Sequence, residues 1–352
     1  MTLKALILGY GYMGEIRRRV VEELPEFELV GICDPFLDPA KAGAACAHWS
    51  EYTRAIDAAK PDIVFVCAPN LYAPDMCIYA LDKGAHVFCE KPPGRDLSDI
   101  KRIIEAEQRH PELKLMFGFN HRHHPAIVEA KSMVDAGRMG RIIWMRGVYG
   151  KSGGQGRDFE RSWRNDPAIS GGGILLDQGI HMLDLFRFFA GDFEEVYGML
   201  STSYWNIPVE DNAQVLLRNA KGQMAQLHST ATLWKHTFRL EIGLEGGYLT
   251  IQGLLSKTGS YGRETLTVGR RPADDEETPV GNPREEIIHF DKDLSWEAQA
   301  HELVNCIQND LPVSDSSSRD ALKVMEIIDA VYRQSPADHR SGTPVKVEGE
   351  VK

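Results

Sequence analysis

The feature that most constrains this chain is a glycine-rich turn between a strand-like and a helix-like segment near its start. Residues 3–8 form a short apolar run, and residues 15–24 have the composition of a helix. The hexapeptide GYGYMG between them comprises Gly9, Tyr10, Gly11, Tyr12, Met13 and Gly14. Glycines at these three positions allow a tight turn, the close approach of a pyrophosphate, and close packing of the helix on the strand. The turn therefore predicts a βαβ unit that binds a dinucleotide.

A carboxylate stands where such a unit binds ribose. A second strand pattern covers residues 29–33 and ends at Asp34, which follows Gly14 by 20 residues (34 − 14 = 20). An acidic side chain at this spacing accepts hydrogen bonds from the ribose hydroxyls. A Pro-Phe pair follows Asp34 in place of an arginine, so a 2′-phosphate would meet a negative charge without a counter-charge. NAD is therefore predicted in preference to NADP. The arginines at 17–19, on the intervening helix, are predicted to face solvent.

Strand and helix patterns continue to alternate up to residue 120. Further strands are expected at 62–67, 86–89 and 114–119, and helices at 75–82 and 97–109. This rhythm is typical of a doubly wound parallel sheet, whose ligands bind at the carboxyl ends of the strands. Residues 1–120 are thus predicted to form an α/β Rossmann domain that binds NAD.

Two loops at the carboxyl ends of these strands are candidates for the cofactor crevice. One contains Ala68, Pro69 and Asn70, and the other contains Glu90 and Lys91 followed by two prolines. A lysine at a strand end faces the crevice, where its charge can hold and polarise a substrate oxygen. We therefore interpret Lys91 as a functional residue and not as a surface lysine.

The patterns change to those of a largely antiparallel sheet after a helix expected at 126–136. Strand-like stretches occur at 142–149, 196–204, 213–217, 224–233, 238–244, 248–252, 266–268 and 287–290. Helices at 294–307 and 319–332 close this α+β domain, which we place at 121–333, and a C-terminal tail follows at 334–352. With few helices to cover it, the large open sheet is expected to keep one bare face, and such a face usually pairs with another subunit.

The segment SGGGILLDQGIHMLD, residues 170–184, is the strongest candidate for the chemistry. If it is helical after its three glycines, then Asp177, His181 and Asp184 stand at i, i+4 and i+7 on one stripe. The helix is apolar nearly all round and hence buried, so these polar groups need partners. The stripe is either a functional site or a structural hydrogen-bond network, and the glycine entry and the doubled aspartate favour function.

Composition excludes several classes of partner. The net charge of −11 argues against nucleic acid and against an anionic membrane surface. The six cysteines show no CxxC pair and are predicted to be buried thiols in a reducing compartment. The chain begins directly with a strand pattern, and no apolar run approaches the roughly 18 residues of a membrane span, so a cytoplasmic location is expected.

Two further segments are candidates for the substrate pocket. Residues 120–125, NHRHHP, contain three histidines without nearby carboxylates, which is a poor metal-ligand set, so no metal is predicted. Asn120 and Arg122 are instead expected to line the pocket, although a structural role fits them equally well. In the Gly- and Arg-rich stretch 150–163, Trp163 is a candidate aromatic platform for a polyol, with a surface loop as the alternative.

Together these motifs resemble the Gfo/Idh/MocA family of nicotinamide-dependent sugar and cyclitol oxidoreductases. The matching pieces, in family order, are GYGYMG, APN at 68–70, CEKPP at 89–93, NHRHHP and SGGGILLDQGIHMLD. The resemblance implies that Lys91 is the catalytic lysine, that Asp177 and His181 are its acid and base partners, and that the C-terminal sheet forms a homodimer or homotetramer. The family often has a histidine where this chain has Ala73, which puts a contact from that loop in doubt.

The resulting hypothesis is an NAD-dependent dehydrogenase that oxidises a secondary hydroxyl of a sugar, a sugar derivative or a cyclitol. His181 would take the hydroxyl proton, Lys91 would hold the oxygen, and Asp177 would orient the base or a neighbouring hydroxyl. Asp184 would support the helix. An NAD-dependent glycosidase of the same fold and a non-catalytic NAD-binding regulator remain as alternatives.

Overall fold

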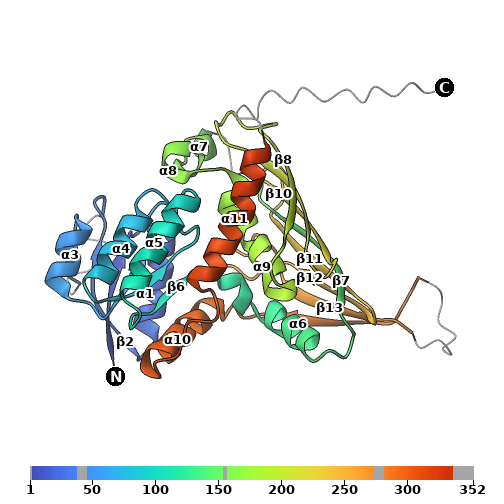
Figure 1. Cartoon of the computed structure of the whole chain (residues 1–352), viewed down its shortest axis with the longest axis horizontal. Coiled ribbons are helices and arrows are strands. Elements are labelled where there is room, and N and C mark those ends of the chain that lie inside the picture. The colour runs from blue at the N-terminus through green and yellow to red at the C-terminus, as the bar shows by residue number, and fades with distance from the viewer. Residues whose placement is uncertain (1, 38–45, 154–156, 273–280, 336–352) are drawn as a thin grey trace.

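The computed structural model describes residues 2–37, 46–153, 157–272 and 281–335, which form two sheets with helices packed around them (Figure 1). The first sheet has six parallel strands in the order β3-β2-β1-β4-β5-β6. Its strands are β1 (Leu3–Leu8), β2 (Phe27–Cys33), β3 (His48–Trp49), β4 (Ile63–Val66), β5 (His86–Cys89) and β6 (Leu115–Phe117). The predicted doubly wound parallel sheet is confirmed.

Helices cover both faces of this sheet. They are α1 (Tyr12–Glu23), α3 (Tyr52–Ala59), α4 (Ala73–Asp82) and α5 (Leu97–Arg109). All four residues of β4 are buried, as expected of a central parallel strand covered on both sides. The sequence analysis overlooked β3 and α3, because two residues of strand and two turns of helix are too short to produce a clear periodicity.

The second sheet has eight strands in the order β14-β13-β12-β11-β7-β10-β9-β8. The strands are β7 (Ile142–Gly150), β8 (Glu195–Ser201), β9 (Asn212–Arg218), β10 (Met224–Thr230), β11 (Thr237–Leu244), β12 (Gly247–Gln252), β13 (Glu264–Arg270) and β14 (Glu285–Phe290). Neighbouring strands are antiparallel except β7 and β10, which pair in parallel. The predicted, mostly antiparallel sheet is confirmed.

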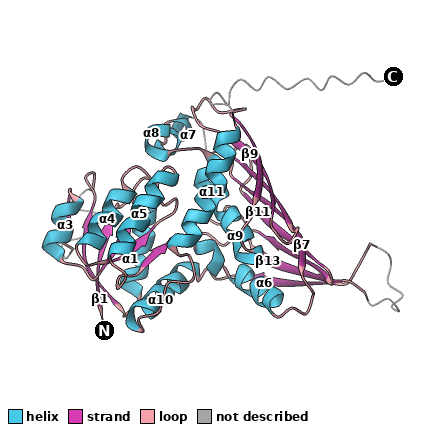
Figure 2. Ribbon diagram, in the orientation of Figure 1, coloured by secondary structure: helices cyan, strands magenta, loops and turns pink. Residues whose placement is uncertain are grey.

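One face of the second sheet carries the helices. Figure 2 shows α6 (Pro125–Asp135), α9 (Ile180–Ala190) and α11 (Ser318–Gln334) on the same side, and no described helix covers the other side. The alternation along β9 follows from this arrangement, since Ala213, Val215 and Leu217 are buried while the residues between them are exposed. The buried apolar residues of the strands therefore face the helices.

One helix predicted in the second domain packs on the first sheet. The helix α10 (Ser295–Gln308) was assigned to the second domain, but its Leu303 and Val304 belong to the same core as Leu3 and Ile7 of β1. The chain returns to the first sheet because α10 brings an apolar face that covers the helices and strands there. The predicted domain bounds themselves remain a prediction, and the predicted tail lies outside the described residues from residue 336 onward.

The cysteines and the lengths of the helices bear on two expectations from composition. All six cysteines are free thiols, and Cys33, Cys77, Cys89 and Cys306 are buried. Among the described residues, no helix combines the length and the apolar character needed to cross a membrane.

Candidate functional site

A cavity of about 310 Å³ lies where the two sheets meet. Its walls include Tyr12 and Met13 at the start of α1, Glu90 and Lys91 after β5, and His181 on α9. The carboxyl ends of the parallel strands thus meet the helix that carries the candidate base. Residues predicted separately for the cofactor and for the chemistry share this cavity.

The glycine turn has the geometry that a dinucleotide requires. Gly9 has a φ of 88°, and a β-carbon on it would lie 2.6 Å from the carbonyl oxygen of Cys67. A β-carbon on Gly14 would lie 2.2 Å from the carbonyl oxygen of Gly9, so α1 packs directly on the turn. A β-carbon on Gly11 would meet no described protein atom within 4 Å. The first and third glycines are thus needed by the fold, whereas the second leaves open space in which a pyrophosphate fits.

Asp34 fixes the turn as well as offering acceptors. Its carboxylate accepts hydrogen bonds of 2.8 Å from the backbone N–H groups of Tyr10 and Phe36. A carboxylate has about four acceptor positions, so capacity remains for the two ribose hydroxyls. The residues present therefore fit an NAD(P) group.

The prediction that all the arginines at 17–19 face solvent is wrong for Arg17. Arg17 is fully buried, and its Nε donates to Glu90 at 2.7 Å while another nitrogen donates to Gln299 at 2.8 Å. Its guanidinium also lies 4.1 Å from the centre of the Phe88 ring. A buried carboxylate needs a partner, so Arg17 holds Glu90 at the edge of the cavity.

The loop at 68–70 lies against the segment before the three glycines. The side-chain amide of Asn70 donates to the carbonyl oxygen of Ser170 at 2.7 Å, and Leu71 N–H donates to Ile169 at 3.0 Å. Ala68 and Pro69 are half-buried beside it. The amide of Asn70 therefore joins the two domains, and the predicted contacts of all three residues with the cofactor remain predictions.

Lys91 and Asp177 are in direct contact. The Lys91 Nζ donates to the main-chain carbonyl oxygen of Asp177 at 2.6 Å and lies 3.7 Å from its carboxylate. Burial lowers the pKa of Lys91, and although Asp177 opposes this shift, the nearby Arg164 and Lys151 add to it. The two residues that the sequence analysis paired are therefore adjacent.

Asp177 has two further cationic partners that the sequence analysis did not assign to it. Lys151 Nζ donates to its Oδ2 at 2.8 Å, and Arg164 Nε lies 3.4 Å from its Oδ1. Burial alone would raise the pKa of Asp177, but Lys151, Lys91 and Arg164 together hold that pKa far below its usual range. Lys151 directly follows β7 of the second sheet, where the strand-end rule for parallel sheets that singled out Lys91 does not apply. The predicted platform Trp163 lies under Arg164, whose guanidinium is 4.5 Å from the ring centre.

The predicted stripe of three polar residues is broken by a π-helical turn. Residues Leu175–Gly179 are π-helical, and α9 begins at Ile180. Asp177 therefore lies within the π turn, whereas His181 and Asp184 both lie on α9, one helical turn apart. The three side chains have separate partners: Asp177 contacts cations, His181 lines the cavity, and Asp184 is fully buried against Arg122.

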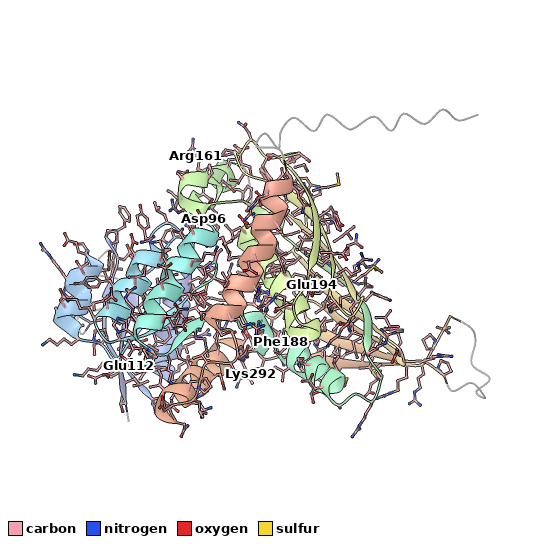
Figure 3. The ribbon with its side chains drawn as sticks, in the orientation of Figure 1. Asp96, Glu112, Arg161, Phe188, Glu194 and Lys292 are labelled. Carbon is pink, nitrogen blue, oxygen red and sulfur yellow. The ribbon has the colours of Figure 1, made fainter. Side chains whose placement is uncertain are left out.

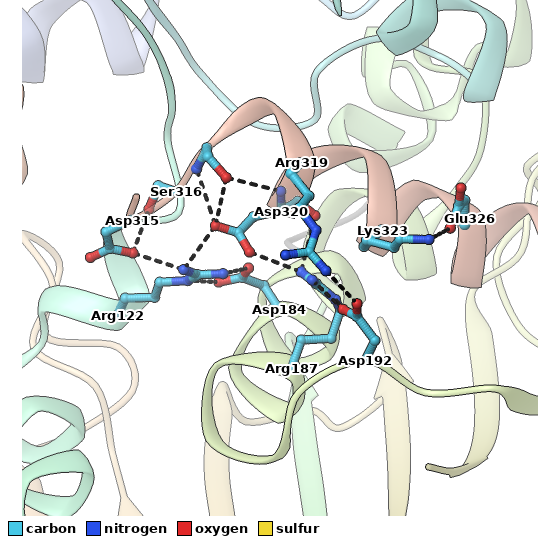
Figure 4. A network of polar contacts seen from close by, with 11 residues as sticks. Arg122, Asp184, Arg187, Asp192, Asp315, Ser316, Arg319, Asp320, Lys323 and Glu326 are labelled. Carbon is cyan, nitrogen blue, oxygen red and sulfur yellow. Dashed lines mark hydrogen bonds and ion pairs between the residues drawn. The ribbon is translucent and has the colours of Figure 1, made fainter. Parts of the chain in front are cut away.

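The partner of Asp184 is Arg122, which corrects the prediction that Arg122 lines the pocket. Its guanidinium donates to both oxygens of Asp184, at 2.5 and 2.8 Å, and also to Asp315 and Asp320 (Figure 4). Arg122 is buried, and these carboxylates hold its pKa well above its usual value despite the opposing effect of burial. The guanidinium is thus occupied by a structural network that ties α9 to α11.

His181 is buried in an aromatic setting. Its ring is stacked on His121, with centroids 3.8 Å apart and planes at 19°. Its Nδ1 is buried without a hydrogen-bond partner among the described residues, so Nε2 is the nitrogen available to a substrate. Burial and the charge of Lys91 hold the pKa of His181 well below 6.5. The imidazole is therefore neutral at neutral pH and can accept a proton.

Other residues around His181 shape the cavity. Asn120 lines it as predicted, and its amide lies 3.3 Å from Ser295 Oγ and 3.2 Å from His121 Nδ1. Tyr149 and Tyr261, which the sequence analysis missed, also line it, with ring centres 5.5 Å apart. They come from the end of β7 and from a loop after β12, positions with no distinctive sequence motif. The described residues contain no group of three or more His, Cys, Asp or Glu side chains placed to hold a metal ion.

The glycine entry is clamped by a buried carboxylate. Glu210 accepts hydrogen bonds from the N–H groups of Gly173 and Leu175, at 2.9 and 3.0 Å, and from Tyr332 at 2.9 Å. A β-carbon on Gly173 would lie 2.2 Å from the carbonyl oxygen of Glu210. Only glycine permits this approach, which fixes the segment leading to Asp177 and His181.

Comparison with known proteins agrees with this architecture. Residues 3–119 match the model of an oxidoreductase family with an NAD-binding Rossmann fold, and residues 127–250 match that of the GFO/IDH/MocA C-terminal domain. A levoglucosan dehydrogenase from Pseudarthrobacter phenanthrenivorans is 27% identical over 63% of this chain and 60% of its own length. An inositol 2-dehydrogenase from Salmonella typhimurium is 31% identical over 42% of this chain and 46% of its own length.

A solved structure of levoglucosan dehydrogenase in complex with NADH has the same fold. It superposes with a TM-score of 0.82 at 22% identity, over 95% of this chain and 96% of that chain. The matched part covers less than two thirds of the length of either sequence relative. The substrates in their names are therefore stated of those two proteins and not of this chain. Because both of its halves match the family models, the chain belongs to the Gfo/Idh/MocA family of oxidoreductases.

Proposed function

We propose that the protein oxidises a secondary hydroxyl of a sugar, a sugar derivative or a cyclitol and transfers the hydride to NAD. The proposal is supported by a single cavity in which residues of the glycine turn and the candidate catalytic residues lie on two walls. One wall comprises Tyr12 and Met13 of the glycine turn, and the other comprises Lys91 and His181. A nicotinamide cofactor held by the turn supplies the hydride acceptor, and the chain supplies the groups that bind the hydroxyl and remove its proton.

His181 is the proposed base. A neutral imidazole accepts the hydroxyl proton at Nε2, and the low pKa of His181 keeps it in this form. Lys91 donates a hydrogen bond to the same oxygen and stabilises the negative charge that develops on it. Asp177 orients Lys91 through the 2.6 Å contact with its main-chain oxygen. Asn120 would contact the substrate from the same side of the cavity.

The proposed roles can be tested with Lys91→Ala and His181→Ala in an assay of NADH formation over a panel of polyols and sugars. Each change is expected to reduce kcat by about 10²–10⁴-fold. The exposed Lys101 and His289 provide matched controls, and their alanine variants should retain wild-type activity. Undiminished turnover in Lys91→Ala or His181→Ala would contradict the role given to that residue.

The same assay separates the two alternatives. An NAD-dependent glycosidase would release a free sugar without net NADH formation. A non-catalytic regulator would bind the cofactor without turning over any member of the panel. Running the assay with NADP in parallel tests the preference for NAD, which rests on Asp34 and the absence of an arginine after it.

We further propose that the bare face of the second sheet pairs with a second copy of the chain. Exposed apolar side chains gather on it, including Trp144, Tyr197, Met199, Leu216 and Met224, which are 41 to 76% exposed. An apolar surface of this kind on a single-sided sheet is typical of a subunit interface. Light scattering should give the mass of a dimer or tetramer, and the double variant Leu216→Lys, Met224→Lys should lower it to that of one chain.

A further inference from the structure

The environment of Asp177 carries more positive charge than the carboxylate can balance. Three cations lie within 4.0 Å of it, namely Lys151 at 2.8 Å, Arg164 at 3.4 Å and Lys91 at 3.7 Å. Counting three positive charges and one negative charge leaves a formal surplus of +2. None of the three cations forms an ion pair with any other carboxylate among the described residues. The whole chain has a net charge of −11, so this surplus is a local feature and not a consequence of composition.

The surplus charge is accessible to a ligand. The side chains of Lys91 and Lys151 are each 18% exposed, and that of Arg164 is 41% exposed. Arg164 lies on the Trp163 ring and Lys151 lies 5.7 Å from the centre of the Phe159 ring, so both cations are held in place by aromatic neighbours. Pre-organised cations that are only partly solvated bind an anion more strongly than mobile surface lysines do.

We infer that the substrate is an anionic sugar, whose carboxylate or phosphate group binds Lys151 and Arg164 while its reacting hydroxyl lies at Lys91 and His181. This inference rests on the proposed function and names the substrate class of the same site. An Arg guanidinium presents a planar fork that suits either anionic group, and a lysine adds a point charge. Such an anionic substituent would neutralise the positive charge of the three cations that Asp177 does not balance.

A purely structural explanation is that the cations exist only to keep Asp177 ionised. A single cation in contact with a carboxylate already lowers its pKa by one to three units or so. Lys151, at 2.8 Å, is such a cation, and Lys91 has its own proposed role at the substrate oxygen, so the structural explanation gives Arg164 no separate function. The two explanations differ in their effect on substrate choice, which makes them separable by experiment.

The first experiment compares sugars that share a ring and differ in charge. Glucose, glucuronate and glucose 6-phosphate form one such set, and the corresponding galactose compounds form a second. NADH formation gives kcat/KM for each sugar. The rise in the melting temperature of the NAD-loaded protein on addition of a sugar reports binding even where no NADH is formed. We expect the anionic members to exceed the neutral member by about 10- to 100-fold in kcat/KM, as for a charge-assisted hydrogen bond. Comparing carboxylate with phosphate identifies the anionic group.

The second experiment removes the charges one at a time. Lys151→Met and Arg164→Gln should each raise KM for the anionic sugar by about tenfold or more relative to KM for the neutral one. Lys151→Arg retains the charge and should restore most of the loss. Arg161→Gln is the matched control, because Arg161 is an exposed arginine beside α7 (Arg157–Glu160) at the margin of the molecule (Figure 3).

The outcomes distinguish this inference from the proposed function. Oxidation of neutral sugars with no gain from an anionic group would overturn the inference and leave the proposed function intact. Thermal stabilisation by anionic sugars alone, lost in Lys151→Met and without NADH formation, would support anion binding by Lys151 and contradict the proposed function. Equal losses for neutral and anionic sugars in Lys151→Met would also overturn the inference and favour the structural explanation.

Discussion

The imidazole rings of His121 and His181 lie face to face, with centroids 3.8 Å apart and planes inclined by 19°. Both side chains are 4% exposed, and burial holds the pKa of each well below 6.5. Two adjacent buried imidazoles cannot both be charged without a large cost, and Lys91 adds a third positive charge that opposes their protonation. The stack thus selects the neutral form that a general base requires.

The pH profile of catalysis should reflect this environment. An ordinary histidine base would produce an acid limb in kcat/KM near pH 6.5. Since the pKa of His181 is lowered, we expect the limb well below pH 6.5. We also expect Lys91→Met to raise the pKa of His181 in an NMR titration, because the change removes a nearby cation. A limb at or above pH 6.5 in the wild-type protein would contradict the role of His181 as a neutral base.

The same two histidines should make the fold sensitive to acid. Their pKa is lower in the folded than in the unfolded chain, so below pH 6.5 the unfolded state binds more protons. Their contribution to stability is complete above pH 6.5 and falls as the pH decreases below it, by about 1.4 kcal/mol per pH unit for each histidine. Urea denaturation between pH 7.5 and 5.5 measures this slope. His121→Asn should reduce the slope, whereas His289→Asn, on an exposed position of β14, should leave it unchanged.

Much of the first domain could be predicted because its signals are local. The glycine turn, Asp34 and the strand end before Lys91 each depend on a few neighbouring residues, and the structure has all of them in the expected elements. Arg17 was misjudged although a signal existed, since Arg17, Val20 and Val21 have the i, i+3, i+4 spacing of a buried face. The error came from treating three consecutive arginines as one solvated surface.

The parts of the site that sequence reasoning missed depend on long-range contacts. Arg122 and Asp184 are 62 residues apart, and nothing in either segment identifies the other as its partner. The π-helical turn at Leu175–Gly179 is set by packing of that segment on its surroundings and has no sequence pattern of its own. The π turn sets Asp177 apart from α9, and the partner Arg122 sets Asp184 apart from His181, so one stripe was predicted where the structure has three separate environments.

The ion pair between Arg122 and Asp184 should be important for stability and not for substrate binding. Arg122→Met leaves the fully buried Asp184 without its main partner, and breaking a buried pair in this way costs about 3–5 kcal/mol. Urea denaturation at neutral pH gives this value. The exposed pair Lys131–Asp135 is the control, since Asp135→Asn should cost less than about 1 kcal/mol. If Arg122→Met lowered the free energy of unfolding by less than about 1 kcal/mol, or changed KM at unchanged stability, Arg122 would instead be a residue of the substrate pocket.

Two glycines of the turn should have different roles, Gly11 in cofactor binding and Gly9 in folding. Gly11 has a φ of −82°, which any residue adopts, and a β-carbon there meets no described protein atom within 4 Å. Gly11→Ala should therefore leave the free energy of unfolding unchanged to within about 0.5 kcal/mol. It should nevertheless weaken NADH binding by about tenfold or more, because the methyl group fills the space meant for the pyrophosphate.

Gly9→Ala is the matched comparison, and its main effect should be on stability and not on cofactor binding. Its φ of 88° is strained for alanine by about 1–2 kcal/mol, and the new β-carbon would lie 2.6 Å from the Cys67 carbonyl oxygen. We therefore expect Gly9→Ala to unfold at a lower urea concentration before any cofactor is added. Fluorescence titration with NADH and urea denaturation of both variants provide the two measurements. Normal NADH affinity in a stable Gly11→Ala would show that the pyrophosphate binds elsewhere, because only a ligand can make that open position intolerant of a methyl group.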